Sequence, residues 1–328
     1  MCLIAVVSAA LLASCAKNAP QDTLKPKGAS ARTIDHLIDP VFIVAGIVFV
    51  LVQTLVVVAI IRFRHREDAP EPVQIHGNTR LELTWTLIPA VILLVIAVPT
   101  IRTIFELART PKNAINVTVI GHQFWWEFRY DDYGIVTANE LHIPVGRPVE
   151  ISLKGDPGEV IHSFWVPALA GKTDIIPGRT NHMHLEADKP GTYLGQCAEY
   201  CGLSHANMRN RGIAQPQDEF DQWVANQKAG PVAPAPGTPE ADGMALFTSK
   251  GCAGCHTIEG ISKGAVGPNL THVESRTTFA GSLFDLTAGN LRTWLHDPPA
   301  VKPGSKMPNL GLSPDEITKL IAYLQSLR

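Results

Sequence analysis

Two long apolar runs constrain the fold of this chain more than any other feature. They cover residues 41–61 and 83–105, and each is almost wholly hydrophobic. A helix of about 21 residues is about 31 Å long at about 1.5 Å per residue, which matches the hydrocarbon core of a bilayer. We therefore predict a transmembrane hairpin with helices over about 39–62 and 83–106, rather than two buried helices of a soluble domain.

The segment between the two runs carries Arg62, Arg64, Arg66 and Arg80. Arginine-rich loops tend to stay on the cytoplasmic side of a membrane, so everything after about residue 105 is predicted to lie on the periplasmic or outer face of a bacterial inner membrane. Glu82 lies at the cytoplasmic edge of the second run. A carboxylate there is either an interfacial anchor or the mouth of a proton path into a neighbouring subunit.

The first residues resemble an export signal. An apolar stretch over residues 3–12 ends in Leu12-Ala13-Ser14-Cys15, which resembles a bacterial lipoprotein cleavage box, although a basic start is missing. We interpret residues 1–16 as a signal peptide with Cys15 lipidated. An ordinarily cleaved signal and an uncleaved apolar start remain open. The formal net charge of -2 and the absence of a dense Lys/Arg run argue against a nucleic-acid partner.

After an N-terminal and hairpin segment at 17–112, residues 113–225 contain short β-rich runs separated by turn signals, which predicts an all-β sandwich or barrel. One loop of this region holds Cys197, Cys201, His205 and Met208, and His162 lies upstream. Thiolate and thioether ligands select copper. Two thiolates can bridge two copper ions, each then capped by one histidine and one weaker ligand, either Met208 or a backbone oxygen such as that of Glu199. A zinc loop and a disulfide are the alternatives.

A Pro/Ala/Gly-rich stretch over 226–239 reads as a semi-rigid linker before a domain at 240–328. There, Cys252 and Cys255 followed directly by His256 form a covalent c-type haem motif. Met307 is the predicted distal ligand, since Met/His ligation raises the haem potential. Met244 is expected to pack, and two other histidines, His272 and His296, are expected at the surface.

Several segments together closely resemble subunit II of the haem-copper cytochrome c oxidases: Leu81-Glu-Leu-Thr-Trp-Thr-Leu-Ile-Pro89, His162-Ser-Phe-Trp-Val-Pro, Pro177-Gly-Arg179 and the 197–208 loop. The C-terminal residues are similar to a class I cytochrome c, so the fusion looks like a caa-type subunit II. The resemblance implies an all-β cupredoxin fold and an all-α cytochrome c domain on a membrane hairpin. It implies a dinuclear CuA centre on six residues: His162, Cys197, Glu199 (through its carbonyl), Cys201, His205 and Met208.

The same resemblance implies a magnesium ion on the Glu199 carboxylate at the catalytic subunit, and it favours the proton path for Glu82. One position departs from the family, which often has Trp where this chain has Phe124, the position associated with electrons arriving from soluble cytochrome c. Trp125 and Trp126 are then either electron-accepting aromatics or core residues.

We expect an electron-transfer subunit of a terminal oxidase. Its expected partners are subunit I, subunit III and an electron donor, which is cytochrome c or a quinol-oxidising cytochrome complex. No nucleophile or substrate pocket is evident, so the oxygen chemistry is assigned to a partner. Two alternatives are a CuA subunit of a nitric or nitrous oxide reductase and a copper-delivery lipoprotein.

Overall fold

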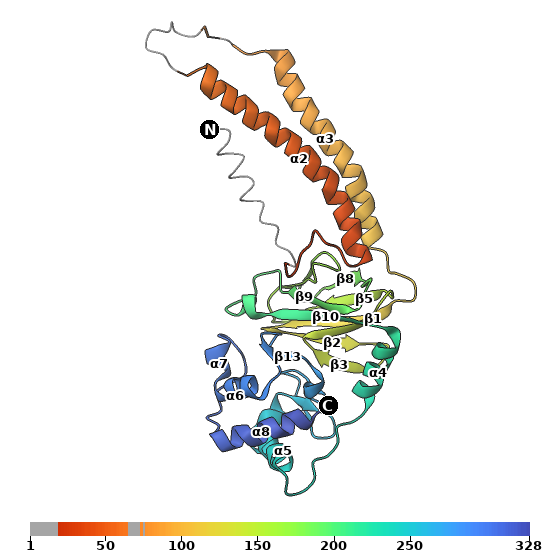
Figure 1. Ribbon diagram of the computed structural model, residues 1–328, viewed down its shortest axis with the longest axis vertical. Helices are drawn as coiled ribbons and strands as arrows, with labels where there is room; N and C mark the ends of the chain where they lie inside the picture. Colours follow the sequence, from red (N-terminus) through yellow and green to blue (C-terminus); the bar gives the residue numbers. More distant parts are fainter. Residues whose placement is uncertain (1–18, 65–72, 75) are drawn as a thin grey trace. The chain divides into compact units, whose positions relative to one another are not determined.

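A computed structural model describes residues 19–64, 73–74 and 76–328 (Figure 1). The predicted signal peptide with Cys15, and Arg66 of the interhelical loop, lie outside the described residues. The chain divides into two units, one over residues 32–109 and the other comprising the residues up to Ala31 and from Thr110 onward.

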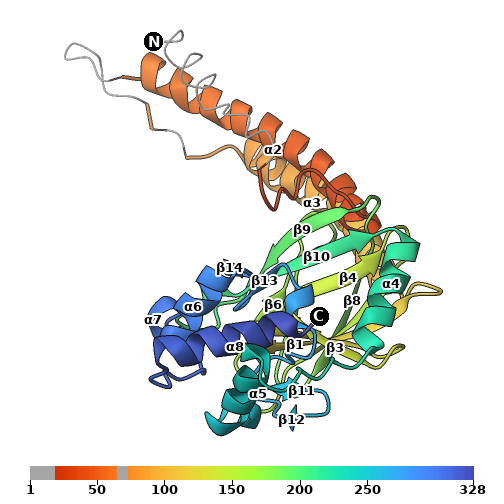
Figure 2. The same cartoon turned by 60° about the horizontal axis from the view of Figure 1, so that its bottom comes forward.

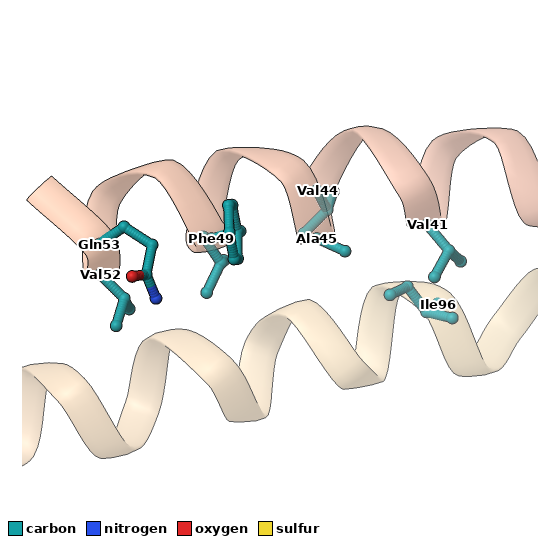
Figure 3. A pocket seen from close by; sticks show the side chains of 8 residues that line it. Val41, Val44, Ala45, Phe49, Val52, Gln53 and Ile96 are labelled. Atoms are coloured by element: carbon teal, nitrogen blue, oxygen red, sulfur yellow. The ribbon is translucent and has the colours of Figure 1, made fainter. Parts of the chain in front are cut away.

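The first unit is a pair of long helices, α2 (Ala29–Arg62) and α3 (Thr79–Leu107). Their most apolar windows have mean hydropathies of 2.9 and 2.3, and none of those residues is buried within the protein, as the predicted hairpin requires. Figure 3 shows apolar side chains of α2, such as Val41, pointing toward Ile96 of α3.

Helix α2 begins ten residues before the predicted start. The reason lies at its first turn, where the hydroxyl of Ser30 donates to the carbonyl of His184 at 3.0 Å and the amide of Ala31 donates to Leu169 at 3.1 Å. The first amides of a helix have no partner within it, so these contacts with the β-domain stabilise the extra turns.

The second unit begins with a two-sheet β-domain, which confirms the predicted all-β fold. The larger sheet has the order β3-β2-β1-β5-β8, in which β1 pairs parallel with β5, and the smaller sheet has the order β4-β10-β9. A short pair, β6 with β7, completes the domain. The strand bounds are β1 (Ile115–His122), β2 (Trp125–Tyr130), β3 (Ile135–Ala138), β4 (Glu140–Pro144), β5 (Val149–Lys154), β6 (His162–Phe164), β7 (Thr173–Ile175), β8 (Thr180–Leu185), β9 (Gly191–Gln196) and β10 (Arg209–Gln215).

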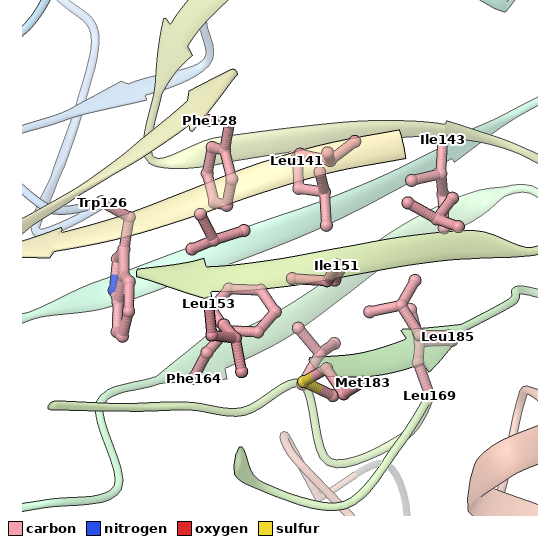
Figure 4. Packing of buried hydrophobic residues seen from close by; sticks show 14 of the residues in the cluster. Trp126, Phe128, Leu141, Ile143, Ile151, Leu153, Phe164, Leu169, Met183 and Leu185 are labelled. Atoms are coloured by element: carbon pink, nitrogen blue, oxygen red, sulfur yellow. The ribbon is translucent and has the colours of Figure 1, made fainter. Parts of the chain in front are cut away.

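Inward-facing side chains of both sheets form the core of this domain. Figure 4 shows Phe128 and Ile151 of the larger sheet beside Leu141 of β4 and Phe164 of β6. Helix α4 (Gln217–Lys228) closes one side (Figure 2), where the Trp223 ring stacks on His142 with ring centroids 4.5 Å apart. This rigid sandwich holds the loops at its ends in place.

The C-terminal domain is built from helices α5 (Pro239–Ser249), α6 (Ala288–His296), α7 (Pro298–Val301) and α8 (Pro314–Ser326), with two-residue hairpins β11 (Thr257–Ile258) with β12 (Ser262–Lys263) and β13 (Thr278–Phe279) with β14 (Phe284–Asp285). Helices α5 and α8 approach closely at Gly243, where a Cβ would lie 2.1 Å from the Lys319 carbonyl oxygen. A capping box of Ser313 and Glu316 starts α8. Because α4 continues through Lys228, the first three residues of the predicted linker are helical.

Candidate metal centres

The cysteine loop connects β9 to β10, and the sheet fixes its two ends. The Cys197 amide donates to the Met208 carbonyl at 2.9 Å, which closes the base of the loop. The adjoining β6 segment runs alongside, since the Ala198 amide donates to Ser163 at 3.0 Å. This pairing brings His162, 35 residues upstream of Cys197, to the loop.

All six groups predicted to hold copper meet at this loop. The two sulfur atoms of Cys197 and Cys201 are 3.9 Å apart, far beyond the roughly 2.05 Å of a disulfide, and both cysteines are free, so the disulfide alternative is wrong. Each thiol has its own imidazole: His162 Nδ1 lies 3.8 Å from the Cys197 sulfur, and His205 Nδ1 lies 3.6 Å from the Cys201 sulfur.

Two weaker donors complete the arrangement, one on each side. Met208 Sδ lies 3.8 Å from the Cys201 sulfur, and the Glu199 carbonyl oxygen lies 3.2 Å from the Cys197 sulfur. The site therefore has an approximate two-fold pattern, with a central pair of sulfurs and one histidine plus one weaker donor at each end. This is the donor set that two thiolate-bridged copper ions require.

The surroundings of the loop also fit a soft metal. Cys197, Cys201, Met208 and His162 are buried, and His162 Nε2 has no hydrogen-bond partner within the described residues. The hydrogen bond from the Cys201 thiol lowers the pKa of Cys197 to about 3, while the same contact raises the pKa of Cys201. A lowered pKa favours the thiolate, which is the form that coordinates copper.

Two residues that the sequence did not single out shape this site. At Gly121 a Cβ would lie 2.8 Å from the His162 ring, so only glycine lets that imidazole sit against β1. The Gln123 side-chain amide donates to the Cys201 carbonyl at 2.6 Å. Neither contact has a signature in residue spacing, because both join segments distant in the chain.

A cavity of about 420 Å³ lies next to the haem motif, between the C-terminal domain and the β-domain, and Cys252, Cys255, His256 and Met307 all line it. The His256 Nδ1–H donates to the Pro268 carbonyl at 2.8 Å, which leaves Nε2 free as a ligand atom. Burial lowers the pKa of His256, which favours the neutral ring that a metal ligand requires. These residues fit a covalently attached haem.

The predicted distal ligand lies in the same cavity. Met307 Sδ accepts a hydrogen bond from Trp294 Nε1 at 3.2 Å, which fixes the thioether in place. Met244 packs against the domain core as expected, and His296 is exposed. The expectation for His272 was wrong, because this residue is buried and its Nδ1 lies 2.7 Å from the Arg328 carbonyl oxygen.

Comparison with known proteins matches each part of the chain. The family model of the cytochrome c oxidase subunit II transmembrane domain matches residues 21–103, that of its periplasmic domain matches 135–211, and the cytochrome c model matches 240–328. Cytochrome c oxidase subunit 2 of Alkalihalophilus pseudofirmus is 40% identical over 93% of this chain and 90% of the relative.

The chain belongs to the cytochrome c oxidase subunit II family.

Its relative of the same name from Bacillus sp. strain PS3 is 38% identical over 81% of the chain and 80% of the relative. Among solved structures, the periplasmic domain of subunit II (CoxB) of Bradyrhizobium japonicum is 31% identical, covering 37% of this chain and 97% of that domain at a TM-score of 0.35. As a subunit II, the chain is part of an oxidoreductase complex with a subunit I partner. It is anchored in a membrane by two helices and carries a periplasmic domain.

Three other predicted residues lie away from the copper loop. Glu82 is in the first turn of α3, where its carboxylate accepts a hydrogen bond from the Asn78 amide at 3.2 Å. Trp125 is half-buried, stacks on His122 with centroids 4.3 Å apart and lines the haem cavity. Trp126 is fully buried with its ring edge toward His162, and so belongs to the core.

Proposed function

We propose that this subunit II carries electrons from its C-terminal haem domain through its copper domain to a catalytic subunit that reduces oxygen to water with proton translocation. The electrons come from cytochrome c or from a quinol-oxidising cytochrome complex. The membrane is the bacterial inner membrane, with both soluble domains on its periplasmic face.

The observation that carries this proposal is the pairing of the thiols. Cys197 and Cys201 lie 3.9 Å apart, and each has its own imidazole within 3.8 Å. Two cysteines and two histidines would also suit one zinc ion, but the further donors Met208 Sδ and the Glu199 carbonyl oxygen exceed the four ligands of a structural zinc site, and a thioether favours copper. When bound, a copper pair and a haem each accept and release one electron.

The protein's own residues hold both sites rigid. His162 is packed between Gly121 and Trp126. In the other domain, His256 is fixed by Pro268 and Met307 by Trp294. A ligand shell that cannot move keeps the geometry of a bound metal the same in both oxidation states, which lowers the reorganisation that electron transfer requires.

The cavity that holds the haem motif is lined on one side by the copper domain. Gln123, Phe124 and Trp125 of the copper domain line it together with Cys252 and Met307. Residues of the copper domain therefore bound the haem cavity, which supports electron transfer from the haem to the copper centre within the chain. We further propose that the Glu199 carboxylate binds magnesium at the subunit I interface, that subunit III belongs to the complex, and that Glu82 serves a proton path.

The test uses the complete oxidase purified with its partner subunits. Sub-stoichiometric reductant should reduce the haem first and the copper centre next, followed by oxygen uptake. Cys201→Ser should retain haem reduction but lose the copper step, while His182→Gln, which changes an exposed histidine of β8, should behave as the wild type. Turnover of nitric or nitrous oxide in place of oxygen would contradict the proposal, as would copper release to an acceptor protein.

A further inference from the structure

A buried carboxylate of the copper domain is bonded to the haem domain. Glu140, at the start of β4, is only 1% exposed. Its Oε1 accepts hydrogen bonds from the Thr277 amide and hydroxyl at 2.9 and 2.5 Å, and from the Thr278 amide and hydroxyl at 2.8 and 2.8 Å. Thr278 is itself fully buried. Two adjacent threonines of the haem domain thus satisfy one carboxylate of the copper domain.

Within its own domain Glu140 has little to replace these donors. His142 Nε2 of the same domain is 4.0 Å away, and burial lowers the pKa of that histidine, which disfavours its charged form. Two arginines also lie in the region. Arg276 of the haem domain has its pKa lowered by burial to about 10 while the Glu140 charge acts in the opposite direction, and Arg211 of the copper domain, opposite Glu140 in the β4–β10 ladder, donates to the Thr277 hydroxyl at 3.3 Å. A carboxylate removed from water needs such partners, and here the haem domain supplies them.

A second buried side chain joins the same two domains, and this one belongs to the haem domain. Lys302 of the haem domain is 3% exposed, and its ammonium donates to the carbonyl of Phe124 in the copper domain and to Ala280, both at 2.6 Å. Next to it, the hydroxyl of Ser204 in the copper loop donates to the Pro303 carbonyl at 2.6 Å.

The Phe124 ring lies between backbone of the two domains. A Cβ at Gly202 of the copper loop would be 3.1 Å from one atom of this ring, and a Cβ at Gly304 of the haem domain would be 3.1 Å from another. The ring is 5% exposed. The two domains also meet at a more exposed contact, the ion pair of Lys306 in the haem domain with Glu159 in the copper domain at 2.6 Å. A solvent-accessible charged rim around buried contacts is typical of a specific interface.

We propose that Glu140 and Lys302 are positioning residues that lock the haem domain onto the copper domain. The face formed by residues 122–125 is then occupied by the chain's own haem domain and closed to an external electron-carrier protein. The lock itself depends only on these contacts, and its consequence for the electron route rests on the proposed function. The docked arrangement also explains why position 124 is Phe rather than Trp, since a larger indole there would displace backbone of one domain.

The test cuts the connection between the domains and asks whether they stay together. A protease recognition sequence replaces residues 231–236, most of which are exposed, in the full-length chain, and the purified protein is then cleaved. The halves should co-migrate in gel filtration. In Glu140→Gln and in Lys302→Met, the dissociation constant between the halves should rise at least tenfold.

Two matched variants act as controls. Glu150→Gln changes another buried glutamate of the copper domain, which faces His182 of the same domain, and Lys250→Met removes a lysine paired with Glu316 within the haem domain. Both should leave the halves associated. Thr278→Val, which removes one hydroxyl and keeps the shape, should give an intermediate loss. Haem and copper absorbance of every variant should be unchanged, which separates undocking from unfolding.

Wild-type halves that separate on cleavage would overturn the lock, and so would an unchanged dissociation constant in Glu140→Gln and Lys302→Met. Failure of the proposed function gives a different result. If the chain shows no haem or copper absorbance but its halves still co-migrate, the contacts between the domains are confirmed and the proposed electron transfer is wrong. Reduction of the copper centre by added cytochrome c should be at least tenfold faster in the undocked variants than in the wild type.

Discussion

Gly267→Ala is the substitution whose effect follows most directly from the haem site. A Cβ at this position would lie 2.5 Å from His256 Cε1 and 2.8 Å from Nδ1. The imidazole cannot turn away easily, because its Nδ1–H is bonded to the carbonyl of the next residue, Pro268, at 2.8 Å. The methyl group must therefore move the ring, the backbone or both.

Overpacking of this kind costs about 1–3 kcal/mol, or roughly a 5- to 150-fold change in the folding equilibrium of the domain. The control is Gly289→Ala in α6, where no atom lies within 4 Å of the added Cβ and the helix favours alanine by up to about 1 kcal/mol. The two variants make the same chemical change and differ only in what the methyl group meets.

Guanidinium unfolding of the haem domain, followed by haem absorbance in the full-length chain, measures both effects. Gly267→Ala should lower the midpoint and weaken the band that reports methionine ligation, because a displaced His256 moves the iron away from Met307. Gly289→Ala should leave both unchanged or raise the midpoint. Equal midpoints and spectra for the two variants would refute the assignment of His256 as a ring fixed by its neighbours.

Three further predictions concern other residues. Met307→His should lower the haem reduction potential by roughly 0.1 V or more, measured by redox titration, because thioether ligation favours the ferrous state; an unchanged potential would exclude Met307 as a ligand. His142→Gln should remove an acid-dependent loss of stability. Burial lowers the folded-state pKa of His142, so below about pH 6.5 the unfolded chain binds more protons, and this contribution makes the free energy of unfolding fall by at most about 1.4 kcal/mol per pH unit. Urea unfolding followed by tryptophan fluorescence at several pH values would show it. A wild-type slope equal to that of the variant would contradict this. Phe124→Trp should weaken association of the cleaved halves at least tenfold, and tighter association would show that the boundary has room for an indole.

The elements that could be predicted from sequence are those with a local pattern. The two membrane helices, strands such as β5 and the capping box at Ser313 each follow from residues close together in the chain. The metal loop was also predictable, because four of its donors lie within twelve residues. The first helix was placed too short, since its early turns depend on Ser30 contacting the distant His184.

The contacts between the domains could not be predicted in this way. Glu140 and Thr278 are 138 residues apart, and Lys302 and Phe124 are 178 apart. A glutamate that begins a strand and a lysine before a Pro-Gly turn read as solvated surface charges. The expectation that His272 is exposed failed for the same reason, because the carbonyl that binds it belongs to Arg328, the last residue.

The loop at residues 197–208 should hold two copper ions beside a haem on the same chain. Electron paramagnetic resonance of the oxidised, membrane-purified protein, combined with metal analysis, decides whether it does. We expect two copper ions and one haem iron per chain, with one unpaired electron coupled equally to both copper nuclei. A signal from a single copper nucleus, or no copper at all in a chain whose haem is intact, would contradict it.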